Sequence, residues 1–193
     1  MPRIIAGIAG GIRLDAPAGR QTRPTSDRVK EALFSIIAPE LPGARVLDLF
    51  AGSGQFGIEA VSRGAVSADL VDNDHASLAC IRTNIARSGL AGIHSIAGDV
   101  YRVLERMAAG GDLRFDLVFL DPPYRLAGQA IERAAALLGR GLLAPDACVI
   151  LEHAAQDDVP AFVTDLQLVR NCKYGGTMLS FYKEIHDDRG SSF

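Results

Sequence analysis

The chain is poor in the residues on which several classes of protein depend. Its three cysteines, Cys80, Cys148 and Cys172, are scattered and odd in number, so they predict neither a disulfide framework nor a paired metal motif. The four histidines fall at no metal-binding spacing either, and we expect no metal. No apolar run approaches the length of a membrane span, and residues 1–3 begin no signal peptide. With 193 residues, the chain fits a single domain. Because the sequence shows no targeting signal, we expect a cytoplasmic protein.

Basic residues are few and unevenly placed. The formal net charge is −3, yet residues 1–30 hold six basic and two acidic side chains, a net +4, while the remainder carries −7. A basic arm on an acidic body can bind a polyanion locally, because phosphate attraction is short-ranged at physiological salt. A solvated basic loop would have the same composition, so charge alone leaves both interpretations open. The candidate RNA-binding residues of this arm are Arg3, Arg13, Arg20, Arg23, Arg28 and Lys30.

Residues 1–40 predict an extension built from a hairpin, a loop and a helix. The segment 3–14 has apolar residues around Gly7 and the pair Gly10-Gly11, which is the turn chemistry of a two-stranded hairpin. Residues 15–24 are polar and carry proline and glycine, which is typical of a loop. A helix is expected from Thr25 or Ser26, as its N-cap, to about residue 37, before the prolines at 39 and 42.

Residues 41–186 predict one α/β domain, and residues 187–193 a polar tail. The predicted strands are 46–50, 68–71, 94–96, 115–120 and 148–151, and the predicted helices are about 55–63, 75–88, 99–108 and 128–139. Short buried strands that alternate with amphipathic helices indicate a doubly wound, mostly parallel sheet. Segments 166–174 and 177–184 then predict a closing antiparallel hairpin. This ending is typical of the class I, Rossmann-like methyltransferase fold, because dinucleotide dehydrogenases usually finish with another parallel strand.

The first chemical motif is the glycine-rich turn that follows the first strand of this domain. Gly52, Gly54 and Gly57 match the spacing of a dinucleotide-binding turn, and Asp72 ends the next strand about 20 residues on. The glycines alone therefore do not separate NAD from S-adenosylmethionine. Asp48 favours S-adenosylmethionine, because a carboxylate suits its cationic methionine end but would repel the pyrophosphate of NAD. A tight turn without a ligand is the structural alternative.

Further donor contacts are expected at the ends of the next two strands. Asp72 can accept hydrogen bonds from both ribose hydroxyls. Asp99 is placed to accept from the adenine amine or to cap a helix, and Asp74 is interpreted as a helix cap. A Gly54→Val change is expected to intrude on the donor while the fold survives. The candidate donor-binding residues are Asp48, Phe50, Gly52, Ser53, Gly54, Asp72, Asn73, Asp99 and Val100.

The second motif, Asp121-Pro122-Pro123-Tyr124, follows the fourth strand and predicts the reaction class. The exocyclic amine of a base is a weak nucleophile that donates two hydrogen bonds. The Asp121 carboxylate and the Pro122 carbonyl can accept both, so that the nitrogen lone pair points at the methyl group. Tyr124 offers a ring on which the target base can stack. Alone, this motif could be a strand-ending turn, but together with the glycine-rich turn it predicts an amino-methyltransferase of nucleic acids.

The two motifs and residues 23–34, which read RPTSDRVKEALF, resemble the RsmD family of methyltransferases over about residues 3–184. The resemblance implies a class I fold whose N-terminal extension contacts RNA. It also implies methylation of N2 of the guanine at position 966 of 16S ribosomal RNA, in an assembled or nearly assembled 30S subunit. The chain departs from the family at Gln55-Phe56, where many relatives have a short polar residue and then leucine, and at Asp72, where glutamate is usual.

Four other activities account for less of the sequence. A DNA amino-methyltransferase would use the same Asp-Pro-Pro-Tyr motif but generally needs a separate recognition domain, for which the chain has no room. A C5-pyrimidine methyltransferase needs a cysteine nucleophile, typically after proline, and no cysteine here follows one. An NAD-dependent oxidoreductase leaves Asp48 and the second motif unexplained. A non-catalytic RNA-binding module explains the basic arm and nothing else.

Overall fold

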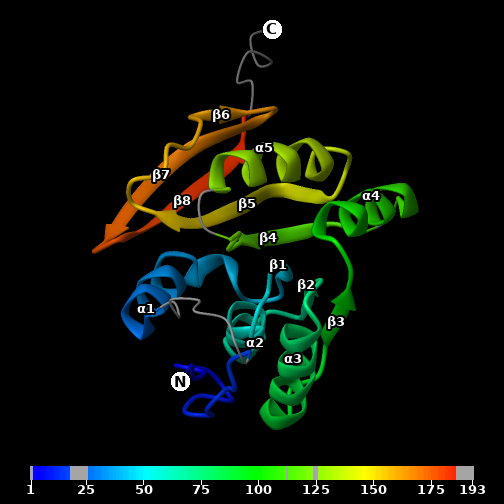
Figure 1. Cartoon of the computed structure of the whole chain (residues 1–193), viewed down its shortest axis with the longest axis vertical. Coiled ribbons are helices and arrows are strands. Elements are labelled where there is room, and N and C mark those ends of the chain that lie inside the picture. Colours follow the sequence, from blue (N-terminus) through cyan, green and yellow to red (C-terminus); the bar gives the residue numbers. More distant parts are fainter. Residues whose placement is uncertain (1, 18–25, 112, 124–125, 186–193) are drawn as a thin grey trace, which may run out of the picture.

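The backbone forms one mixed sheet. The computed structural model describes residues 2–17, 26–111, 113–123 and 126–185. Its strands stand in the order β3-β2-β1-β4-β5-β8-β7-β6 (Figure 1). Neighbours from β3 to β5 are parallel, and those from β5 to β6 are antiparallel. The strands are β1 Arg45–Leu49, β2 Ser67–Asp72, β3 Ile93–Ala97, β4 Phe115–Leu120, β5 Leu143–Ala154, β6 Phe162–Val163, β7 Leu166–Tyr174 and β8 Thr177–Glu184.

Helices cover both faces of the sheet (Figure 1). One face carries α1 (Asp27–Ile36), α2 (Gln55–Ser62) and α3 (His75–Ser88), and the other carries α4 (Val100–Gly110) and α5 (Ala127–Leu138). A short 3-10 turn, η1 (Ala38–Glu40), follows α1. None of these helices is long and apolar enough to cross a membrane. Each face has its own hydrophobic core, because side chains alternate along a strand.

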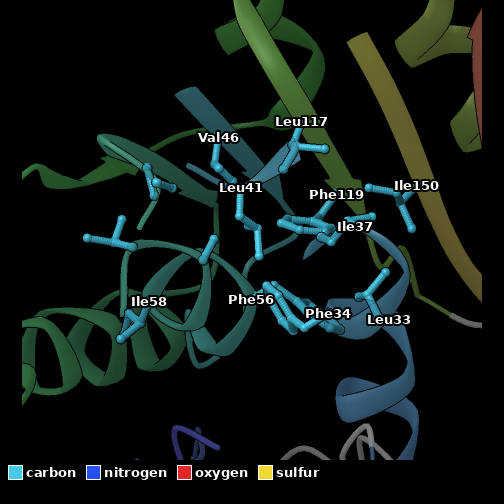
Figure 2. Close-up of a cluster of buried hydrophobic side chains, with 14 of the residues drawn as sticks. Leu33, Phe34, Ile37, Leu41, Val46, Phe56, Ile58, Leu117, Phe119 and Ile150 are labelled. Carbon is cyan, nitrogen blue, oxygen red and sulfur yellow. The ribbon is translucent and has the colours of Figure 1, made fainter. Parts of the chain in front are cut away.

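Aromatic rings pack between α1, α2 and β4, close to the turns that carry the two motifs. The rings of Phe56 in α2 and Phe119 in β4 stack with centroids 5.5 Å apart, and Phe34 of α1 packs against Phe119 at 6.0 Å. Figure 2 shows Phe56 and Phe34 below Phe119, which lies beside Leu41 and Ile37. Offset aromatic pairs of this kind add to the stabilisation from burial alone. The first turn of α2 is therefore fixed against the strand that leads to Asp121.

The predicted mostly parallel sheet with a closing antiparallel hairpin is confirmed, and the differences are local. Strand β5 begins five residues earlier than expected, and the two-residue strand β6 was not predicted. Ser26 caps α1 by accepting from the Val29 amide, whereas Thr25 lies outside the described residues.

The N-terminal hairpin is shorter than the sequence predicted. An antiparallel bridge joins Arg3 and Arg13, and beside it the Ile4 amide donates to the Ile12 carbonyl and the Leu14 amide to the Pro2 carbonyl, both at 2.9 Å. The Glu59 carboxylate of α2 accepts two further backbone donors, the amides of Ile5 and Ala6, at 2.7 and 3.0 Å. The segment turns so close to α2 at Gly7 that a Cβ atom there would lie 1.9 Å from the Ser62 carbonyl oxygen. The predicted hairpin is therefore present as a short antiparallel pair that packs on α2.

Candidate functional site

A cavity of about 620 Å³ opens at the carboxyl ends of the parallel strands. Open α/β sheets bind their ligands at this edge, so the position is the expected one for a site. The cavity brings together the turn after β1, the end of β2, the segment after β4 and the end of β5. Its lining includes Phe50, Gly52, Ser53, Gln55, Phe56, Asp72, Asn73, Asp121, Pro122, Pro123, Glu152, His153, Gln156, Asp157 and Thr177.

The turn after β1 has the backbone of a ligand-binding loop. Phe50, Gly52 and Gly54 have φ of 62°, 58° and 76°, in the left-handed region that suits glycine. Phe50 and Gly52 line the cavity, but Gly54 does not. A Cβ atom on Gly54 would meet a methyl carbon of the buried Leu70 at 2.6 Å. The expectation that Gly54→Val blocks the donor while the fold survives is therefore wrong, because the added side chain enters the core.

Asp48 lies beneath this turn and is completely buried. Its Oδ2 accepts a hydrogen bond from the Gly57 amide at 3.0 Å, whereas its Oδ1 has no hydrogen-bond partner among the described residues. Burial raises the pKa of the Asp48 carboxyl well above its ordinary value, and the nearby Asp121 and Asp72 raise it further. Asp48 does not itself line the cavity, because the glycine-rich turn after β1 lies between the two. A ligand group would have to pass this turn to contact Asp48.

Asp72 holds the turn in place from the end of β2. Its Oδ2 accepts from the Gly52 amide at 2.8 Å, and its Oδ1 accepts from the Asp74 amide at 2.9 Å. Each carboxylate oxygen can accept a second hydrogen bond, and Asp72 lines the cavity together with the exposed Asn73. The geometry is compatible with the predicted contact to ribose hydroxyls.

Two of the predicted donor contacts lie away from the cavity. Asp99 caps α4 by accepting from the Arg102 amide at 3.1 Å, and neither Asp99 nor the buried Val100 lines the cavity. The predicted cap at Asp74 is confirmed, since it accepts from the Ser77 amide at 2.8 Å and caps α3. The cap therefore accounts for Asp99 without a ligand.

The segment after β4 carries the predicted catalytic group. Asp121 and Pro122 are both half-buried and line the cavity, on the strand next to β1. The Asp121 amide donates to the Leu49 carbonyl at 3.4 Å, which joins this segment to the end of β1. Tyr124, the predicted stacking ring, lies outside the described residues. The cavity thus contains the Asp121-Pro122 corner and the glycine-rich turn together.

Sequence reasoning missed the far wall of the cavity, which the end of β5 and the start of β8 provide. Glu152, His153 and Thr177 line the cavity there. The ring of His153 is fixed on both sides, because its Nδ1 lies 2.9 Å from the Ala154 carbonyl and its Nε2 lies 2.7 Å from Ser180 Oγ. Burial lowers the pKa of His153. The sequence did offer a signal for Glu152 and His153, because they lie at the end of β5, the strand that follows β4 along the chain.

The basic arm divides into exposed and buried side chains. Arg3, Arg13 and Arg28 are exposed, and Arg3 forms an ion pair with Asp27 at 2.8 Å. Lys30 is instead completely buried, where its Nζ lies 3.3 Å from Glu59 and donates to the Arg3 carbonyl. Lys30 is therefore corrected from a candidate RNA contact to an internal ion pair. Arg20 and Arg23 lie outside the described residues. Within the described part of the chain, no group of three histidine, cysteine or acidic residues could hold a metal ion.

Comparisons with known proteins agree with this architecture. A family model described as "Conserved hypothetical protein 95" matches residues 2–183. YlbH of Bacillus subtilis, whose name provisionally assigns it rRNA methyltransferase activity, is 38% identical over 94% of this chain and 98% of its own length. Ribosomal RNA small subunit methyltransferase D of Escherichia coli is 32% identical over 94% of this chain and 89% of its own. A solved Thermus thermophilus structure has a TM-score of 0.80 at 32% identity, and the match covers 94% of this chain and 98% of that one. The chain therefore belongs to the Conserved hypothetical protein 95 family, the RsmD family of methyltransferases.

Proposed function

We propose that this protein transfers a methyl group from S-adenosylmethionine to N2 of a guanine in small-subunit ribosomal RNA. The target would be the guanine at position 966 of 16S ribosomal RNA, in an assembled or nearly assembled 30S subunit in the cytoplasm. One observation carries the proposal: the Asp121-Pro122 corner and the glycine-rich turn line the same cavity. A methyl donor on the turn and an amine at the corner would then be neighbours. The family supplies the choice of RNA and base.

The donor half of the cavity fits S-adenosylmethionine in its chemistry. Two buried acceptor oxygens near the start of α2, Asp48 Oδ1 and Gln55 Oε1, have no hydrogen-bond partner among the described residues. A buried acceptor without a partner is costly, and an ammonium group has three N–H donors to offer. The methionine ammonium of the donor would supply these bonds, while the Asp72 carboxylate would accept from the ribose. NAD has no ammonium group to offer to Asp48.

Residues of the corner would prepare the amine for attack. When bound, the donor supplies a methyl group on a positively charged sulfur. Asp121 and the Pro122 carbonyl would accept the two amine hydrogens and direct the nitrogen lone pair at the methyl carbon. As the carbon–nitrogen bond forms, the electron pair of the carbon–sulfur bond stays on sulfur. The excess proton on nitrogen is then next to the Asp121 carboxylate. The contact to Asp121 strengthens as positive charge develops, so it accelerates the reaction rather than binding alone.

Replacement of Asp121 tests this function. Asp121→Ala should lower the single-turnover methylation rate on undermethylated small subunits by about 100- to 1,000-fold, which corresponds to roughly 3–4 kcal/mol of lost transition-state stabilisation. Asp121→Asn keeps an acceptor oxygen without the charge and should be intermediate. The affinity for S-adenosylhomocysteine, measured by calorimetry, should change little.

Asp116→Asn is the matched control, because Asp116 lies at the other end of the same strand and accepts a backbone hydrogen bond from the Arg45 amide, which asparagine can also accept. It should methylate at the rate of the unaltered protein. Near-normal methylation by Asp121→Ala would refute the role of Asp121. Methylation of another base, located by mass mapping of the RNA, would refute the proposed target.

A further inference from the structure

The register of the sheet places a second acid beside Asp121. Strands β4 and β5 are parallel, and Leu120 of β4 pairs with Leu151 of β5. The next residues along the two strands are Asp121 and Glu152. Leu120 and Leu151 both pack into the core under α4 and α5, so the following side chains both leave the sheet on the opposite face. Both residues line the same cavity.

The end of β5 holds Glu152 in a rigid position. Glu152 is half-buried between the fully buried Leu151 and His153, whose ring is fixed by its two hydrogen bonds. Two hydrogen bonds hold the backbone just after Glu152. The Ala154 amide donates to Asp157 at 3.2 Å, and the Ala155 amide donates to the Gly176 carbonyl at 3.0 Å. A site that discriminates between ligands needs side chains held by such surroundings.

Two neighbouring acceptors match one base in particular. In guanine the N2 amine is next to N1–H, so two adjacent positions of its Watson–Crick edge are donors. In adenine and in cytosine, the ring nitrogen next to the amine is an acceptor. A carboxylate beside Asp121 would accept from N1–H of guanine, but it would face a lone pair in the other two bases. Discrimination is strong where a buried polar group would lose its partner.

We propose that Glu152 accepts the N1–H of the target base and thereby selects guanine over adenine and cytosine. The proposal rests on the proposed function, because it assumes that Asp121 holds the reacting amine. It adds the residue that distinguishes the target, which neither the glycine-rich turn nor the Asp121-Pro122 corner can do. Glu152 is a specificity residue in this role, and the methyl transfer itself stays with Asp121.

A substrate analogue tests the contact in the unaltered protein. 2-Aminopurine keeps the N2 amine but has an acceptor at N1 in place of N1–H. Small subunits reconstituted with guanine at the target position should be methylated roughly 100-fold faster or more than those with 2-aminopurine, measured as the apparent second-order rate constant under single-turnover conditions. A preference below about threefold would overturn the proposal without recourse to any variant, because N1–H would then not be read.

Glu152→Gln assigns the preference to this side chain. Glutamine keeps an acceptor for N1–H and adds N–H donors that can bond the N1 lone pair of 2-aminopurine. The variant should therefore reduce the preference for guanine at least tenfold, chiefly by gaining activity on 2-aminopurine. The matched control is Asp158→Asn, an exposed acid six residues further on that does not line the cavity and should retain the full preference. An unchanged preference in Glu152→Gln would overturn the role of Glu152.

The two levels of the proposal fail differently. If the unaltered protein does not methylate guanine in small subunits, the proposed function fails. If it does, with the full preference over 2-aminopurine, and Glu152→Gln keeps that preference, only the role of Glu152 fails. S-adenosylhomocysteine affinity and thermal unfolding show that each variant is folded. If Glu152→Gln unfolds, Glu152→Ala takes its place and should likewise lose the preference, while the analogue comparison in the unaltered protein can still overturn the proposal.

Discussion

At the scale of single residues, Asp48 combines a structural cost with a proposed binding role. The Asp48 carboxyl is buried with one oxygen unpaired among the described residues, and its pKa is raised well above the ordinary 3.8. In the unfolded chain this carboxyl ionises near its ordinary pKa. As pH rises from about 4 through the raised pKa, the unfolded state loses the proton first, and the free protein loses stability. The loss is complete above the folded-state pKa.

We expect Asp48→Asn to separate these two effects. Asparagine can still accept from the Gly57 amide, but it carries no buried charge. The variant without donor should unfold at the same or a higher temperature than the unaltered protein at pH 8. Its melting temperature should also fall less between pH 4 and pH 8. Its affinity for S-adenosylhomocysteine should drop about tenfold or more, since a hydrogen bond to a charged group contributes roughly 1.5–3 kcal/mol. Calorimetry and thermal unfolding measure both quantities, and unchanged affinity would contradict the ammonium contact.

At the scale of elements, Glu59 joins the N-terminal segment, α1 and α2. Its buried carboxylate accepts from the amides of Ile5 and Ala6, lies 3.3 Å from the Lys30 ammonium and lies 2.7 Å from Arg63 Nε. Desolvation lowers the pKa of Lys30, and the neighbouring Glu59 partly offsets that effect. The buried Glu59 carboxylate and its ion pair with Lys30 therefore help to attach the proposed RNA-contacting extension to α2.

Loss of Lys30 should weaken this attachment strongly. Lys30→Met leaves a buried carboxylate with Arg63 as its one remaining cation among the described residues. We expect a loss of about 3 kcal/mol in the free energy of unfolding, because removing one partner of a buried pair typically costs roughly 3–5 kcal/mol. Arg28→Ala, two residues away on the exposed face of α1, is the matched control and should cost less than about 0.5 kcal/mol. Denaturant unfolding compares the two, and equal stability would show that the pair contributes nothing.

We expect the exposed arginines of the extension to bind RNA phosphates. Changing Arg3, Arg13 and Arg28 together to alanine should reduce the slope of log K against log salt by about 2, because each phosphate that a protein neutralises adds roughly 0.7–0.9 to that slope. The reduction should fall short of three full phosphate contacts because Arg3 already pairs with Asp27. Affinity for S-adenosylhomocysteine should not change.

A matched triple variant controls for the loss of net charge. Arg82, Arg102 and Arg140 are exposed on other parts of the surface, and their replacement by alanine removes the same charge. Binding to small-subunit RNA, measured over a range of salt, should keep its slope in this variant. If both triple variants change the slope equally, general charge rather than the extension accounts for RNA binding.

At the scale of the whole molecule, the site depends on strands that are far apart in the sequence. The proposed donor half comes from the ends of β1 and β2, and the proposed target half comes from the ends of β4 and β5 and the start of β8. The strand order places β4 between β1 and β5. Asp121 therefore lies next to the glycine-rich turn on one side and next to Glu152 on the other. The site is thus a product of the sheet order.

The sequence by itself determined the order of elements, the edge of the sheet at which the cavity opens, and the residues of both motifs. These follow from local rules: hydrophobic alternation for the strands, glycine and proline for the turns, and side-chain caps such as Asp74 and Ser26. Membership of the family could also be inferred, because the motif at residues 23–34 is contiguous in the sequence.

Only the tertiary structure decided which side chains meet. Lys30 is basic in the sequence like its exposed neighbour Arg28, but its place on the inner face of α1 brings it to Glu59, and the buried acid retains it there. Gly54 matches a ligand-binding pattern, yet its missing side chain would point at Leu70. Glu152 belongs to no motif, and it lies beside Asp121 because the register aligns β5 with β4. Each of these facts is a contact between residues distant in the chain, and local pattern and charge carry no information about such partners.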